Sequence, residues 1–313
     1  MSFLLVVTAL AVAGDAMTPG VVPTCGGEQP VSPVGGTYTC SFTDDFDGTT
    51  YDTSTWVAQD SAISGMTTGN HDCFVGTPDT IAVSDGAAHL SSRRTAAPFT
   101  CHSPYGDFTS QSVAGSLTTY NRFAQTYGRF EFRARFPATR AVGVHSALWL
   151  YPNKLTYGPW PKSGEIDVAE WFSNQPNIAL PSVHYEGERF GVSSGLTCTT
   201  ATPEDYHSYA VAWTPSAMYF YLDGRLCWQH SWLPYSTLVG AQPFDQPFNI
   251  VLAQAFGPGP NNLPTAATPD VDTLDVDWVR AWSWTPAGPD VSSQPKPAVG
   301  TALVRYHHRR RAG

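Results

Sequence analysis

Short runs of valine, tyrosine, phenylalanine and tryptophan recur along this chain, and clusters of glycine, proline, asparagine and aspartate separate them. With 27 glycines and 26 prolines in 313 residues, these clusters supply the punctuation that many turns need. The sequence shows neither long amphipathic helical stretches nor an obvious internal repeat. This pattern is typical of an all-β sandwich, and the length admits one large domain of that kind.

The octapeptide 164–171, Gly-Glu-Ile-Asp-Val-Ala-Glu-Trp, holds three acids within six residues. Charged residues make up only 14% of the chain, against about a quarter in ordinary domains, so this concentration needs a reason. Apolar β-branched residues alternate with Glu165 and Asp167, which indicates a half-buried strand whose first two acids share one face. Glu170 comes one residue too late for that face, and a β-bulge after Asp167 would return it there.

Acids held on one face in this way suit the hydrolysis of a glycosidic bond. Retaining glycosidases use two carboxyl groups about 5–5.5 Å apart: one attacks the anomeric carbon, and the other protonates the leaving oxygen and later takes a proton from water. A third acid between them helps to separate their affinities for a proton, because like charges held close together cannot all ionise. From the spacing alone, an acidic strand face on solvent or a calcium site is an equal alternative.

The octapeptide resembles the Glu-x-Asp-x-x-Glu signature of glycoside hydrolase family 16 in its bulged, laminarinase-like form. Order and spacing agree with that family from about Phe42 to Trp284. The other segments that carry the resemblance are Tyr127–Arg135, Ser146–Pro152, Trp160-Pro161, Val183–Tyr185, His207–Tyr209, Trp213–Pro215, Tyr221–Gly224 and Val276–Trp282. One departure is His145-Ser146-Ala147, where family members often carry Trp-Pro-Ala, and it implies that a sugar platform is missing there.

The resemblance implies a role for each acid. Glu165 would be the nucleophile and Glu170 the general acid/base, while Asp167 would hydrogen-bond within the pair and tune it. His184 would lie beside the acid/base, and Trp160 would flank the cleft.

Three tryptophans near the acids are candidate sugar platforms, because indole faces pack well on the CH faces of sugar rings. Trp160 stands in the proline-bearing loop Gly158-Pro159-Trp160-Pro161, where binding is the favoured reason for an exposed indole. Trp149 is predicted with equal weight to face the sugar or the core. Trp171 is predicted to face the core.

The resemblance also implies the architecture and the reaction. The fold would be a two-sheet antiparallel β-jelly roll with an open concave cleft, and the enzyme would be a retaining endo-hydrolase of β-1,3-glucan or, next in order, of mixed-linkage β-1,3-1,4-glucan. A non-catalytic glycan-binding jelly roll is the alternative from another class, followed by a structural wall-associated protein. Whether water or a second sugar is the final acceptor stays open, as does another polysaccharide as substrate.

No cofactor is expected for catalysis, but the resemblance raises the expectation of a structural calcium ion far from the acids. Its side-chain ligand would be Asp277, with further oxygens from Gly86 and the Asp44-Asp45-Phe46 region. An exposed Asp277 without an ion is an equal alternative. Such an ion would stabilise the fold and take no part in hydrolysis.

Six cysteines allow fifteen pairings, and an exported chain is expected to form disulfides. Sequential pairing is favoured, and free buried thiols are the alternative. The favoured pairs are Cys25–Cys40, Cys73–Cys101 and Cys198–Cys227.

The charge of the chain is distributed unevenly. Residues 24–285, the predicted catalytic domain, hold 12 basic and 24 acidic residues, and the whole chain has a net charge of −9. An acidic body repels phosphate backbones, so nucleic acid is not expected as a partner. A neutral polysaccharide is the expected partner, and a monomer is the expected state.

The two ends of the chain have their own compositions. Residues 1–23 contain a ten-residue apolar run and the small-residue pattern Ala11-Val12-Ala13, which together indicate a signal peptide that is too short to cross a membrane. A buried N-terminal strand is the alternative. Residues 286–313 are proline-rich and end in basic residues, a composition typical of a disordered tail. We therefore expect a secreted protein.

Overall fold

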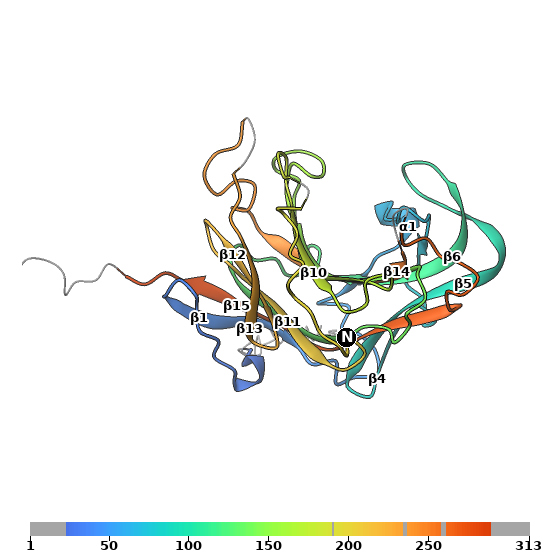
Figure 1. Cartoon of the computed structure of the whole chain (residues 1–313), viewed down its shortest axis with the longest axis horizontal. Helices are drawn as coiled ribbons and strands as arrows, with labels where there is room; N and C mark the ends of the chain where they lie inside the picture. Colours follow the sequence, from blue (N-terminus) through green and yellow to red (C-terminus); the bar gives the residue numbers. More distant parts are fainter. Residues whose placement is uncertain (1–22, 190, 234–236, 258–260, 289–313) are drawn as a thin grey trace, which may run out of the picture.

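The computed structural model describes residues 23–189, 191–233, 237–257 and 261–288 and is shown in Figure 1. Its strands are β1 (Thr37–Asp44), β2 (Val57–Ala58), β3 (Cys73–Phe74), β4 (Ile81–Ser84), β5 (Ala87–Cys101), β6 (Phe108–Thr118), β7 (Gly128–Arg135), β8 (Val144–Pro152), β9 (Glu165–Phe172), β10 (Ala179–His184), β11 (His207–Trp213), β12 (Met218–Leu222), β13 (Arg225–His230), β14 (Phe248–Phe256) and β15 (Val271–Thr285). Two short helical turns, η1 (Cys25–Gly27) and α1 (Ser61–Ser64), complete the elements.

The strands form two layers that share the long hairpin β5–β6. Strands run in the order β10-β9-β8-β14-β6 in one layer, which we call the β9 layer, and β5-β15-β7-β11-β12-β13 in the other, which we call the β15 layer. Neighbouring strands are antiparallel except for β3, which pairs with β6 in parallel over two residues. The predicted all-β antiparallel sandwich of the jelly-roll kind is confirmed.

A single large hydrophobic cluster joins the two layers. Leu148 and Leu150 of β8 and Phe130 and Phe132 of β7 are fully buried in it. Side chains alternate between the two faces along a strand. The residues of β8 that alternate with Leu148 and Leu150 must therefore lie on the other face of the β9 layer. That outer face, which we call the acid face, carries the candidate site. In Figure 1, the connection after β10 and the β5–β6 hairpin rise on opposite sides of β14.

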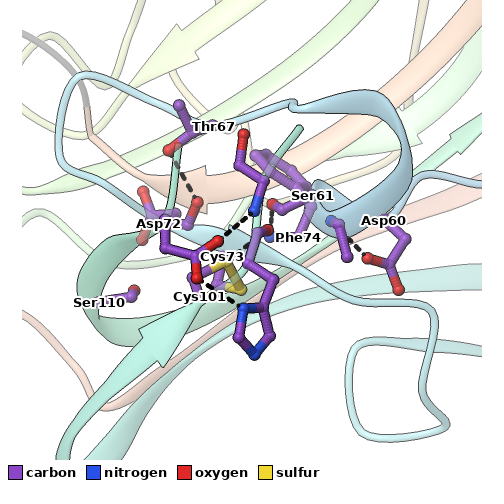
Figure 2. Close-up of a disulfide and its surroundings, with 12 residues drawn as sticks. Asp60, Ser61, Thr67, Asp72, Cys73, Phe74, Cys101 and Ser110 are labelled. Carbon is purple, nitrogen blue, oxygen red and sulfur yellow. Dashed lines mark hydrogen bonds and ion pairs between the residues drawn. A yellow bond between two sulfur atoms is a disulfide. The ribbon is translucent and has the colours of Figure 1, made fainter. Parts of the chain in front are cut away.

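The three predicted disulfides are all present. They link Cys25 with Cys40, Cys73 with Cys101, and Cys198 with Cys227. The second one ties the short strand β3 to the end of β5, next to the buried Asp72 (Figure 2). A hydroxyl of Ser112 donates to the Asp72 carboxylate, while burial raises the pKa of that carboxyl. This link fixes the segment that borders β6 at one end of the acid face.

The termini give no test of the predicted leader and tail. Residues 1–22 and 289–313 lie outside the described part of the chain, so the predicted signal peptide and basic tail stay predictions. None of the helices in the described part has the length and apolar character needed to span a lipid bilayer.

Candidate active site

Strand β9 contains the irregularity that the acid spacing predicts. Opposite β8, Ala169 pairs with Leu148 and Asp167 pairs with Trp149, so Val168 is an extra residue on β9. The register with β10 shifts at the same place. Such a bulge changes the alternation of side chains by one step, and Glu170 therefore returns to the face of Asp167.

The core residues of β9 confirm this arrangement from the opposite side. Ile166, Ala169 and Trp171 are fully buried, and Trp171 Nε1 donates to the carbonyl of Pro176. These apolar residues occupy the core face both before and after the bulge. Glu165, Asp167 and Glu170 consequently share the acid face, and the prediction that Trp171 belongs to the core is confirmed.

His184 lies next to Glu165, at the end of β10. The two residues are direct register partners, and His184 Nε2 lies 3.2 Å from Asp167 Oδ2. On its other side, Nδ1 of His184 lies 3.1 Å from both carboxylate oxygens of Glu188. The expectation that His184 stands beside Glu170 is therefore wrong: the bulge and the β9–β10 register bring it to Glu165 and Asp167 instead.

Burial and mutual charge set the protonation of this cluster. Burial and the neighbouring Asp167 raise the pKa of Glu165 well above its usual range, although His184 opposes the shift. Burial and the charge of Glu170 raise the pKa of Asp167 to about 6. Burial disfavours the imidazolium form of His184, but the hydrogen bond and charge of Asp167 outweigh it and raise the pKa of His184 to about 10. Glu165 and Asp167 therefore hold protons more tightly than free carboxyls do.

Glu170 has a histidine of its own, supplied by β8. His145 Nε2 lies 3.1 Å from Glu170 Oε1. The same imidazole stacks on the ring of Phe172, with centroids 4.5 Å apart. The sequence marked this position only as a missing sugar platform, so its contact with an acid is a feature that sequence reasoning missed.

The two remaining tryptophans both lie close to the acids. Trp149 pairs directly with Asp167 across β8 and β9, and directly opposed residues share a face. Of the two predicted positions for Trp149, the sugar side and the core, the register therefore favours the acid face. The Trp149 ring lies 5.6 Å from the ring of Tyr151. Trp160 is 54% exposed, and its ring lies 5.8 Å from the ring of His184.

The acid face also contains a set of donor atoms that a metal ion would accept. Atoms of Glu165, Asp167 and His184 lie within 4.8 Å of one another. Within the described ranges, they are the one group of three or more such side chains this close together. The same three groups also fit an acid cluster that exchanges protons without a metal.

Comparison with known proteins gives this geometry its context. A family model described as "Glycosyl hydrolases family 16" matches residues 70–279, well over half of the chain. The chain belongs to this family. The match includes β9 with its three acids, β8 and β10.

The chain is similar in sequence to glucanases from two organisms. The chain is 29% identical over 263 residues, 76% of its length, to "Glucan endo-1,3-beta-glucosidase A1" of Niallia circulans. It is 33% identical over 197 residues, 58% of its length, to "Beta-glucanase" of Rhodothermus marinus. These alignments cover 37% and 66% of the two relatives, so the chain spans less than two thirds of either.

The solved structure of a laminarinase has the same fold. The laminarinase from Rhodothermus marinus superposes with a TM-score of 0.65 at 27% identity. The superposition covers 80% of this chain and 99% of the laminarinase. The jelly-roll architecture therefore extends over nearly all of that enzyme.

The expected calcium site of family 16 does not fit the side chains around Asp277. The guanidinium of Arg133 donates to the Asp277 carboxylate. Asp44, from the other expected region, accepts from Trp56 Nε1 at 2.7 Å and from the backbone N–H of Phe46 at 2.9 Å. An ion at Asp277 would have to displace Arg133. The calcium site stays a prediction, and measuring the melting temperature with and without calcium would test it.

Proposed function

We propose that the protein is a retaining, endo-acting glycoside hydrolase that cleaves β-1,3-linked glucan. The observation that carries the proposal is the bulge in β9, which brings Glu165, Asp167 and Glu170 to one face. Family membership and the printed names of the two relatives, a glucan endo-1,3-β-glucosidase and a β-glucanase, support the substrate class.

The reaction proceeds in two displacements at the same carbon. Ionised Glu165 attacks the anomeric carbon while Glu170 gives its proton to the departing glycosidic oxygen, and a covalent glycosyl-Glu165 ester forms. Glu170, now ionised, then takes a proton from water, whose oxygen attacks the anomeric carbon and releases Glu165. Two inversions leave the configuration unchanged.

Asp167 and His184 prepare the nucleophile for the first displacement. The His184 imidazolium counteracts the pKa increase of Glu165 that burial and Asp167 cause. Its ring is held between Asp167 and Glu188. The His184 cation therefore favours the ionised form of Glu165, which is the form that attacks.

The sugar rings are bound by the aromatic side chains that border the acids. Trp149 and Tyr151 lie on the acid face of β8, and Trp160 extends from the loop before β9. An indole that is 54% exposed, as Trp160 is, gains apolar burial when a sugar ring stacks on it. These aromatic side chains remain available for sugar binding although position 145 carries a histidine and not a tryptophan.

A panel of polysaccharides tests the proposal. We expect reducing ends to appear from laminarin fastest, from mixed-linkage β-glucan next, and not from agarose or carrageenan. An endo mode predicts that viscosity falls well before most linkages are cut. Proton NMR of the first products should show the β anomer, and an initial α anomer would contradict retention.

The same panel separates the alternatives. A non-catalytic glycan-binding module would bind laminarin but release no reducing ends from any substrate. A transglycosylase would produce longer oligosaccharides from laminari-oligomers before shorter ones appear. Release from another polysaccharide in preference to laminarin would move the substrate assignment while leaving the mechanism intact.

Secretion is part of the proposal. Three disulfides within the described residues suit an oxidising environment, and polymeric glucans lie outside the cell. The oligomeric state is proposed to be monomeric. Light scattering of the purified chain checks that state, and detection in the culture medium checks secretion.

A further inference from the structure

We propose that His145 is a positioning residue for Glu170, in that its Nε2–H holds Oε1 of Glu170 and leaves Oε2 to exchange the proton with the glycosidic oxygen. The inference rests on the proposed function, because it assigns a partner to the acid/base. It concerns a position at which this chain departs from the family pattern.

The register of β8 and β9 explains how the two side chains meet. Ala147 lies directly opposite Glu170, and His145 lies opposite Phe172. His145 is therefore a diagonal neighbour of Glu170 on the same face, a separation that long side chains can bridge. Since Ala147 is small, nothing from the directly opposed position prevents Glu170 from leaning towards His145, and the contact of 3.1 Å results.

The orientation of the imidazole is constrained on its flat side. Its ring lies 4.5 Å from the Phe172 ring at an interplanar angle of 26°. The side chains of His145 and Glu170 are only 14% and 18% exposed, so water competes little for their contact. Stacking therefore aims Nε2 at the carboxyl group instead of leaving the ring free to rotate.

The other neighbours of Glu170 cannot replace this contact. Across β10 its register partner is Leu180, and across β8 it is Ala147; neither side chain forms hydrogen bonds. Among the described residues, His145 is the one hydrogen-bond partner of the Glu170 side chain, and Oε2 has none. The two carboxyl oxygens are thus unequal before any substrate binds.

This inequality matters for proton transfer. An oxygen that already accepts a hydrogen bond from Nε2–H is a poorer place for the acid proton, so the proton resides on Oε2. Oε2 then gives it to the leaving oxygen in the first displacement and takes one from water in the second. In both displacements, the contact between His145 Nε2 and Oε1 holds the carboxyl group in place.

The test compares substrates that do and do not need an acid. The ratio kcat/KM reports the steps up to the covalent intermediate. In those steps a 2,4-dinitrophenyl leaving group departs without protonation, whereas a natural glucosyl leaving group requires a proton. We expect His145→Phe, which keeps the stack and loses the donor, to lower kcat/KM on laminari-oligosaccharides about 10- to 100-fold. KM should change little, and kcat/KM on the dinitrophenyl β-glycoside should fall less than about threefold.

Two further variants complete the experiment. His145→Gln, whose amide can donate to Oε1, should recover most of the loss on oligosaccharides. His102→Asn removes an exposed histidine from a pair with Asp107 and should leave both substrates at wild-type rates. If His145→Phe fails to reach the wild-type melting temperature, His145→Leu takes its place in the same comparison.

Equal losses on the two substrates, no loss on either, or a Gln variant no better than Phe would each overturn the inference. A wild-type protein that hydrolyses neither substrate would instead overturn the proposed function. The two failures are therefore distinguishable in one set of assays.

Discussion

Strands β9 and β15 carry the same acid-x-acid pattern at a bulge, but their acids have different partners. In β9, Glu165 and Asp167 precede a bulge at Val168. In β15, the register against β7 shifts between Val276 and Trp278, so the second acid, Asp277, is itself the extra residue. Both pairs lie on the face of their layer that points away from the core, so the backbone alone does not distinguish them.

The partners distinguish them. Arg135 Nε donates to Asp275 at 2.7 Å, Arg133 donates to Asp277, and the ring of Tyr206 lies within 4.9 Å of both guanidinium carbons. The described residues give the β9 acids no arginine or lysine partner, only His184 and His145. Because a guanidinium is always charged, each β15 acid is held in an ion pair that serves stability. The β9 acids face imidazoles instead, which can gain and lose protons.

The largest effect should come from removing the proposed nucleophile, Glu165. Glu165→Gln is expected to lower kcat on laminarin by about 10⁴-fold or more, because no covalent intermediate can form. Its melting temperature should stay equal to or exceed that of the wild type, since one of three crowded acids is gone. Unchanged release of reducing sugar by this variant would end the catalytic assignment.

A smaller effect on kcat is expected from replacing the proposed acid/base, Glu170. Glu170→Gln should lower kcat on laminarin by about 10²–10⁴-fold, the usual range for general acid–base catalysis. On an aryl glycoside with a good leaving group, the loss in kcat/KM should be much smaller than the loss on laminarin. Parallel kinetics of both substrates measure this, and equal losses would argue against an acid role.

The charges around Glu165 should move the acidic limb of the pH profile in opposite directions. Activity rises with pH as Glu165 ionises. Asp167→Asn removes a charge that raises the pKa of Glu165, so the limb moves to lower pH. His184→Gln removes a cation that lowers this pKa, so the limb moves to higher pH. Profiles of kcat/KM between about pH 3 and 9 give both shifts, and shifts of the same sign would contradict this account.

The smallest effect should be on stability and should come from the β15 layer. Arg135→Met leaves Asp275 without its guanidinium partner, although His89 still lies 2.6 Å from the carboxylate. Because the Arg135 side chain is 46% exposed, we expect a loss of only about 1 kcal/mol, or about 2–4 °C in melting temperature. Since kcat should not change, a variant that lost activity but not stability would break the contrast between the two strands.

The sequence was sufficient for features that depend on local spacing. The alternation of acids with β-branched residues and the late Glu170 together predict the bulge in β9, and the same parity places Trp171 in the core. The family resemblance supplied the fold. Sequential cysteine pairing was also correct, which agrees with the short separations of 15, 28 and 29 residues.

Features that depend on the register between strands could not be predicted from the sequence. Which residue of β10 faces Glu165 depends on the connection between β9 and β10 and on the bulge, and a slip of one residue changes every pairing. His184 was therefore assigned to the wrong acid. His145 was noticed as a departure, but its diagonal contact with Glu170 requires the β8–β9 register, and Arg133 at Asp277 requires that of β7 and β15.

The most direct test of the central claim is to trap the covalent intermediate. A 2-deoxy-2-fluoro β-laminaribioside with a good leaving group slows both displacements, and mass spectrometry of the intact protein and its peptides then locates the sugar. We expect one fluorosugar per chain, on Glu165 in the peptide that contains residues 164–171, and none on Glu165→Gln. A label on another residue, or turnover of laminarin by a wild-type protein that never becomes labelled, would contradict the account.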